Sequence, residues 1–335
     1  MKKSLALSVL ALLSVAAGVA QAQTSLTVYG IADIGLLREY GHLGPSVTKL
    51  DSGLQSGSRL GFKGTEDIGN GMKALFVLET GLRIDKGGFA QGGLAFARQS
   101  YVGLDSRLGT LTLGRQNQSE FIALDAIDPF GTGLAGTSTN LFYFPRDIRN
   151  NNMVMYATPT FGGFSGELQY AFGEVPGNSS KGRNIGGAFG YAAGPLQVKL
   201  SYEKESLTTS LTGDSDRMTM LSGGYDFSVA QLGFAYQKAK NNNTLDENNA
   251  LIGVTVPFGA SAIMASYIRH NDRLSSGNNA NQIALGYTYS LSKRTNLYSS
   301  YARIGGSNQS AKTVGNATDG GTNDHAFNVG IRHKF

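Results

Sequence analysis

Apolar and polar side chains alternate along most of the chain. Residues 164–172 place Phe, Gly, Leu, Tyr and Phe on one parity and Ser, Glu, Gln and Ala on the other. The same two-residue period recurs over 196–203, 252–258 and 282–289. Successive side chains of an extended strand point to opposite faces, so this period predicts strands with one apolar and one polar face. No segment sustains a helical period over three turns.

About sixteen such strands are expected. They begin near residues 24, 56, 72, 94, 109, 152, 164, 184, 196, 217, 230, 249, 260, 281, 294 and 324. Short links such as 106–109 and 193–195 alternate with long polar links such as 39–52 and 305–324. Tight turns at one rim and long loops at the other are typical of an up-and-down barrel in the outer membrane. A sandwich of this length would need Greek-key crossovers, for which the sequence has no regular place. The predicted fold is therefore all-β, a 16-stranded antiparallel transmembrane β-barrel.

The last strand continues the pattern to the final residue. Phe327, Val329, Ile331 and Phe335 share one parity, and the other parity includes Arg332 and Lys334. Terminal segments fray unless they are tied down. We therefore expect this strand to pair with the first one and close the cylinder without an edge.

Residues 1–22 have the pattern of a cleaved export signal. Lys2 and Lys3 form a basic start, residues 5–19 an apolar core, and residues 20–22 (AQA) a small-residue cleavage site. We expect the signal to be removed and the barrel domain to span residues 23–335, located in the cell outer membrane. The remainder has no apolar run long enough to cross a bilayer as a helix.

Composition argues against bound cofactors and against catalysis. The chain has no cysteine, which excludes disulfides and thiolate metal sites. None of its four histidines, His42, His270, His325 and His333, accompanies a nucleophile motif, so we expect no enzyme activity, cofactor or metal. The net charge is only +5 and gives no indication of a nucleic-acid partner.

The longest link, about residues 116–151, is too long for an ordinary surface loop. It carries Phe121, Ile122, Leu124 and Ile127, which would be poorly placed in solvent. We expect this segment to fold into the lumen, bury these side chains against the wall and narrow the channel.

An ordered set of short segments carries a family resemblance. They are residues 26–33 (LTVYGIAD), 57–67 (GSRLGFKGTED), 76–81 (FVLETG), 101–104 (YVGL), 113–116 (LGRQ), 127–130 (IDPF) and 330–335 (GIRHKF). Together they resemble the general porins of β-proteobacteria and Neisseria, and most of all the anion-selective type. The resemblance implies an outer-membrane, water-filled diffusion channel for small anions and other hydrophilic solutes. It also implies a homotrimer, an inward-folded third loop, and a terminal Phe335 read by the barrel assembly machinery.

Selectivity in such a channel comes from charged side chains at the narrowest point. Rings of basic side chains favour anions, and low-dielectric walls focus their field. By resemblance, Arg59, Arg98 and Arg149 project from adjoining wall strands at the constriction. Arg149 matches through the spacing to Asn152, Val154 and Tyr156, and Arg146 competes for the same role.

Further charged residues are expected near these arginines. On one strand, Lys73 and Arg83 share the face of Glu79. Glu79 is the acidic candidate on the wall, and Glu120, Asp125 and Asp128 are the candidates on the inward loop. The sequence does not decide which side chains of residues 96–104 face the lumen. Arg98 has the same parity as the apolar Val102 and Leu104, which would place all three on the lipid face. A β-bulge between them would turn Arg98 to the lumen.

The same barrel class also includes solute-specific channels, adhesins and enzymes. A channel specific for a sugar or organic acid would line its path with aromatic rings, and Phe142, Tyr143 and Phe144 are the residues suited to begin one. We favour the interpretation that these rings anchor the inward loop. A barrel adhesin or a barrel enzyme has less support. Lipopolysaccharide and outer-membrane lipid are the expected surroundings.

Overall fold

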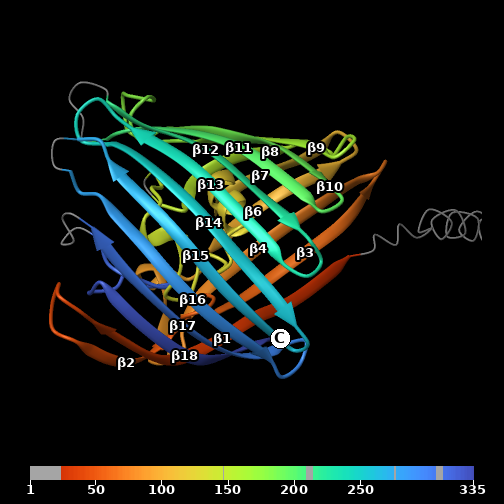
Figure 1. Cartoon of the computed structure of the whole chain (residues 1–335). Helices are drawn as coiled ribbons and strands as arrows, with labels where there is room; N and C mark the ends of the chain where they lie inside the picture. The colour runs from red at the N-terminus through yellow and green to blue at the C-terminus, as the bar shows by residue number, and fades with distance from the viewer. Residues whose placement is uncertain (1–23, 146, 209–213, 275–276, 307–311) are drawn as a thin grey trace, which may run out of the picture.

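The computed structural model of the protein describes residues 24–145, 147–208, 214–274, 277–306 and 312–335. Within these residues the chain forms one closed, strongly tilted antiparallel barrel (Figure 1). The expected export signal lies outside the described residues. None of the described helices is long and apolar enough to cross a membrane.

The strands, in chain order, are β1 (Ser25–Tyr40), β2 (Val47–Ser52), β3 (Arg59–Gly69), β4 (Met72–Arg83), β5 (Gly88–Phe89), β6 (Gln99–Ser106), β7 (Gly109–Asn117), β8 (Arg149–Ala157), β9 (Phe164–Ala171), β10 (Asn184–Ala193), β11 (Leu196–Ser206), β12 (Ser215–Asp226), β13 (Gln231–Lys240), β14 (Asp246–Phe258), β15 (Ser261–Asp272), β16 (Ala280–Ser290), β17 (Thr295–Gly306) and β18 (His325–Lys334). The helical segments are η1 (Gln91–Gly93), α2 (Ser119–Asp125) and η2 (Ser138–Asn140).

The barrel has sixteen wall positions. Strand β3 pairs with residues 25–31 of β1, and β2 pairs with residues 34–39 of the same strand. The two therefore follow each other along one side of β1 and fill one wall position. Strand β5 is a two-residue extension that pairs only with the end of β4. The predicted number of strands is confirmed. The link 39–52 was expected to be a loop, and this was wrong, because its second half is β2, held by hydrogen bonds to β1.

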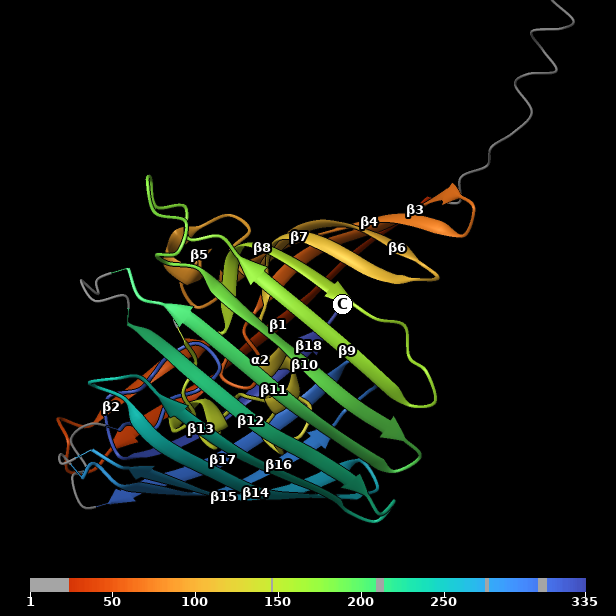
Figure 2. The same cartoon turned by 90° about the horizontal axis from the view of Figure 1, so that it is seen from above.

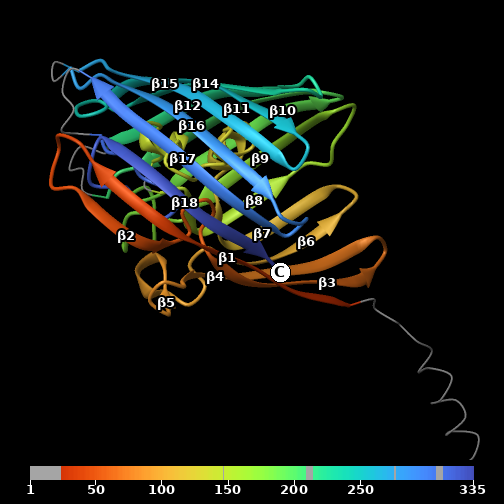
Figure 3. The same ribbon diagram turned by 60° about the horizontal axis from the view of Figure 1, so that its bottom comes forward.

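The first and last strands close the barrel. Strand β18 pairs antiparallel with β1, with Leu36 opposite Val329 and Ile34 opposite Ile331. The terminal Phe335 exchanges backbone hydrogen bonds of 3.1 and 3.0 Å with Gly30. The start of β1 and the end of β18 lie at the same rim, with the short turns (Figure 3). The expected pairing is therefore confirmed.

Burial along the strands is reversed relative to a soluble sheet. The apolar parity is exposed, as at Leu26 (65%) and Ile283 (62%), whereas polar residues of the other parity such as Gln237 and Asn328 are fully buried. A sandwich would bury the apolar face in its core. An exposed apolar outer face around a polar interior is the arrangement of a barrel in lipid.

The segment between β7 and β8 lies inside the barrel (Figure 2). Its polar atoms reach wall strands far apart in the sequence. These contacts are Ser119 to Gln169 of β9, Tyr143 to Gln237 of β13, Asn140 to Gln282 of β16, and Ala135 to Ser300 of β17. Its apolar side chains, including Leu124, Phe130 and Leu141, form a buried cluster with inward residues of the wall. The segment thus crosses the lumen and is held along its length.

Candidate functional site: a basic pocket in the lumen

A cavity of about 370 Å³ lies where the inner segment faces β1, β3 and β18. Its charged lining residues are Arg59, Arg98, Arg149, Arg332, Lys334 and Asp125. The structure therefore brings together the three arginines expected at the constriction, from strands and links that are distant in the sequence. It adds two further cations from the last strand and one carboxylate from the inner segment.

The position of Arg59 follows from the interruption between β2 and β3. Asp33 of β1 accepts hydrogen bonds from the backbone N–H groups of Gln55 (2.9 Å) and Ser56 (2.6 Å). These bonds hold the short connection against the inner side of β1. Arg59 follows at once as the first residue of β3, and its Nε donates to the carbonyl of Gly57 at 2.9 Å. The guanidinium is thereby directed into the lumen.

Arg98 is held by a carboxylate of the wall. Its Nε donates to Glu79 Oε1 at 2.8 Å, and the Tyr29 hydroxyl donates to Glu79 Oε2 at 2.9 Å. Arg59 approaches the same carboxylate less closely, with Nη1 3.8 Å from Oε1. Glu79 therefore lies beneath two of the arginines as a shared counter-charge.

The structure resolves the facing of residues 96–104. Strand β6 begins only at Gln99, and along it Val102 and Leu104 are exposed on the outer face. Arg98 precedes the strand, and Ala97 and Arg98 are both buried. Two consecutive buried residues break the alternation, so parity alone would have placed Arg98 in lipid.

Arg149 has no direct ion-pair partner among the described residues. It is the first residue of β8 and is buried. Among the residues that the structure describes, no carboxylate lies within ion-pair distance of it, and its Nε has no hydrogen-bond partner. A guanidinium stays charged at any physiological pH. The pocket therefore contains a permanent positive charge with room for an external anion.

Three further cations were absent from the predicted site. Arg332 and Lys334 line the pocket from β18, and Arg332 donates to Asn296 (3.0 Å) and Ser56 (2.9 Å). The sequence predicts both on the wet face of the last strand, as a positive lining beyond the constriction and not as part of it. Arg115 lies behind the pocket and donates to Asn151 at 2.6 Å. Arg115 has the parity of the outward leucines of β7, so the sequence would place it in lipid. The register between β7 and β8 shifts between Gly114 and Gln116, and the sequence does not show this irregularity.

The carboxylates of the inner segment lie in three different places. Asp125 lines the pocket and accepts a hydrogen bond from Thr132 at 2.5 Å; burial raises its pKa. Asp128 is buried and accepts the backbone N–H groups of Phe130 (2.9 Å) and Ser138 (2.8 Å), which shapes the segment itself. Of the three predicted acids, only Asp125 lines the pocket. Asp147, at the end of the same segment, was not predicted and lies 3.6 Å from Arg115, behind the pocket.

Glu120 lies in α2, against the opposite wall. Its carboxyl lies beside that of Glu203 of β11, and burial raises the pKa of Glu120. Two carboxyl groups held together in this way favour a state in which at least one is protonated. Glu120 thus joins the inner segment to the wall, away from the basic pocket.

The remaining predicted cations do not line the pocket. Lys73 is exposed at the turn end of β4, with Asp105 as its cross-strand partner. Arg83 is at the opposite end of the same strand, across from Gly88 of β5. Arg146 lies outside the described residues.

Comparison with known proteins now decides the family. The model of the Gram-negative porins matches residues 6–309. The chain belongs to this family.

An outer membrane porin protein of Bordetella pertussis is 33% identical over the full length of both chains. Outer membrane porin protein 32 of Delftia acidovorans is 34% identical, again over both full lengths. The solved structure of an anion-selective porin from Comamonas acidovorans aligns with a TM-score of 0.79 at 32% identity, covering 93% of this chain and 100% of that one. The protein is thus an outer-membrane porin, a channel and not an enzyme.

The aromatic residues near the end of the porin's inner segment pack against the wall. Phe142 is buried in the apolar cluster, and Phe144 meets Phe121 edge to face at 6.0 Å between centroids. The Tyr143 hydroxyl donates to Asp216, and the Tyr143 backbone exchanges hydrogen bonds with Gln237. These rings hold the segment in place and do not form a stacked path.

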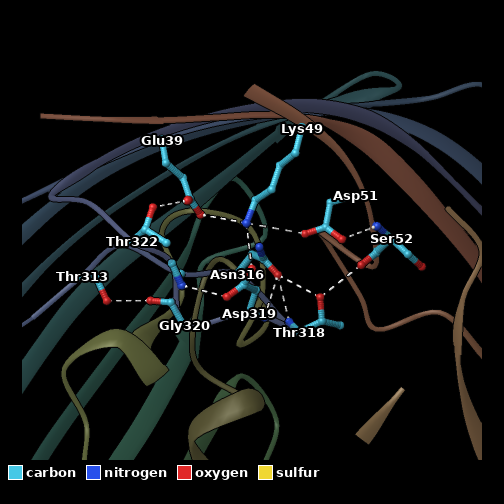
Figure 4. Close-up of polar contacts among 12 residues, drawn as sticks. Glu39, Lys49, Asp51, Ser52, Thr313, Asn316, Thr318, Asp319, Gly320 and Thr322 are labelled. Atoms are coloured by element: carbon cyan, nitrogen blue, oxygen red, sulfur yellow. Dashed lines mark hydrogen bonds and ion pairs between the residues drawn. The ribbon is translucent and has the colours of Figure 1, made fainter. Parts of the chain in front are cut away.

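A second polar network joins β1 and β2 to the last loop, at the rim with the long loops (Figure 4). Lys49 of β2 lies 2.7 Å from Asp319, 3.3 Å from Glu39 and 4.0 Å from Asp51. Burial opposes ionisation of Asp319, but the hydrogen bond from Lys49 keeps its pKa below the usual range. Gly315 donates to Asn140 of η2 at 2.9 Å. The described part of the last loop is therefore tied both to the wall and to the inner segment, a contact that the sequence did not predict.

Proposed function

We propose that this porin is an anion-selective diffusion channel for small hydrophilic solutes, with the basic pocket as its selectivity site. The observation that carries the proposal is the balance of charge around the pocket. Five cations line it against the single carboxylate of Asp125, and Arg149 has no carboxylate within ion-pair distance among the described residues. A field of fixed positive charges in a low-dielectric wall raises the local concentration of anions.

The placement of the inner segment supports the same proposal. Because the segment crosses the lumen, an ion that passes between it and the wall with the arginines is exposed to their field. Arg332 and Lys334 extend the positive lining along β18. The anion-selective porin from Comamonas, which shares the fold at 32% identity, is consistent with this function.

The experiment is a measurement of reversal potential in planar bilayers under a salt gradient. The double variant Arg59→Ser/Arg98→Ser should shift the reversal potential toward cation preference. Lys73→Ser/Arg107→Ser serves as the control, because it removes two charges from the turn end of the barrel and leaves the pocket intact. Unchanged selectivity in the first variant would contradict the proposal.

The assembly is proposed on the resemblance. We propose a homotrimer in which residues 1–22 are removed on export and Phe335 is read by the barrel assembly machinery. The exposed ring of Phe335 at the end of a fully paired strand is compatible with that role. Outer-membrane lipid and lipopolysaccharide surround the barrel, and no cofactor is involved.

A further inference from the structure

Three basic residues form a row on the outer face of the barrel. Lys204 of β11 is opposite Arg217 of β12, and Arg217 is opposite Lys240 of β13. Lys238, one step lower on the same face of β13, is exposed, as is Lys240. Neighbouring strands lie about 4.8 Å apart, so the three cations are adjacent along one line across the strands. We call these three cations together with Lys238 the basic row.

The basic row has no ion-pair partner within the part of the chain that the structure describes. Among the residues that the structure describes, none of its members forms an ion pair. The acids adjacent in sequence, Glu203, Glu205 and Asp216, have the opposite parity and are buried on the inner side. Asp246, opposite Lys240 in register, is instead 3.9 Å from Arg273.

Such an arrangement is costly in isolation. Like charges directly opposite one another on adjacent strands destabilise the pairing. The one acid beside these three cations, Asp246, is paired with Arg273, so the row is expected to have an external anion as its partner. Basic side chains so close together can contact a single phosphate group, and their hydrogen bonds to it are charge-assisted.

The height of the row on the barrel indicates where that anion is. Below it on the same outward face follow Tyr202 and Tyr236 and then Leu200, Leu221 and Phe234, all exposed. Aromatic residues mark the membrane interface of such barrels, with apolar residues between the two belts. The row itself is at the rim with the long loops, which faces outside. The outward face of these strands ends at the other rim in Leu196, Tyr225 and Leu232, without a cation.

We propose that the basic row binds the phosphate groups of lipopolysaccharide in the outer leaflet. The row lies at headgroup height, immediately above the aromatic belt and on the outside-facing rim only. Its several adjacent cations match a headgroup with more than one phosphate better than a phospholipid with a single one. The proposal rests on the outer-membrane location and does not depend on the selectivity of the pore.

The test is equilibrium binding of fluorescently labelled lipopolysaccharide to the purified, delipidated full-length porin in detergent. The variant Lys204→Gln/Arg217→Gln/Lys240→Gln should bind about tenfold or more weakly, because several charge-assisted contacts are lost. The control Arg107→Gln/Lys293→Gln/Arg294→Gln removes three exposed charges at the opposite rim and should bind as the unchanged protein does. Dephosphorylated lipopolysaccharide should bind the unchanged protein as weakly as the first variant binds the intact lipid.

Two outcomes would overturn the proposal. One is unaltered binding by the triple variant. The other is phosphatidylglycerol binding to the unchanged protein as tightly as lipopolysaccharide does, with the same loss in the variant, which would assign the row to a phospholipid. Should the triple variant fail to fold, Arg217→Gln alone removes the central charge. It should weaken binding about threefold, and no change in it would equally count against the site.

Discussion

Arg98 donates a hydrogen bond from Nε to Oε1 of Glu79 over 2.8 Å, joining the residue before β6 to the neighbouring strand β4. Glu79 is buried and also accepts the Tyr29 hydroxyl. The carboxylate therefore holds the wall arginines from behind and offsets part of their charge. It does not oppose them from the other side of the bore, where Asp125 is the acid that lines the pocket.

Replacing Glu79 by Gln should make the channel more selective for anions. The amide keeps an acceptor for Arg98 but removes the negative charge beside Arg59 and Arg98. A change of roughly 1 kcal/mol in the potential at the pocket corresponds to about a fivefold change in the anion-to-cation permeability ratio. The ratio is measured from reversal potentials. A shift toward cations would mean that Glu79 mainly positions Arg98.

Anion preference should rise as the pH falls through the raised pKa of Asp125. Burial raises that pKa above its ordinary value of 3.8. Below the pKa the carboxyl is neutral and the pocket gains net positive charge; above it the carboxylate offsets one arginine. Asp125→Asn should show high anion preference at every pH, with a flat profile. Glu120→Gln is the matched control and should keep the pH response of the unchanged protein, because Glu120 lies against β11, away from the pocket.

Pro129 of the inner segment packs against the inner wall of the barrel at Gly253 of β14. A Cβ at Gly253 would overlap the Pro129 ring. Gly253→Val should push the inner segment into the bore and lower the single-channel conductance, at a packing cost of about 1–3 kcal/mol. Gly166→Val is the control, since its Cβ would meet only Thr158, at 3.6 Å or more, and a backbone oxygen at 3.8 Å. Equal conductance in both variants would show that Pro129 does not fix the segment.

Strand positions and faces were predictable from the sequence because they depend on local alternation. The outward set in β13, for example, is Leu232, Phe234, Tyr236, Lys238 and Lys240, as parity requires. The expectation that Arg59, Arg98 and Arg149 lie together at the constriction came from the family resemblance. For Arg98, parity gave the opposite facing, because the residue precedes the strand.

The sequence by itself determined an all-β barrel with an apolar outer face, a polar lumen and a long inner segment, since each follows from the period and length of local runs. Only the tertiary structure decided which charges meet. It placed Asp125 at the arginines and Glu120 at Glu203, and it aligned Lys204, Arg217 and Lys240 in one row. Those contacts depend on the hydrogen-bond register between strands and on the path of a segment across the lumen. Both are set by interactions between residues distant in the chain, and for that reason no local pattern contains them.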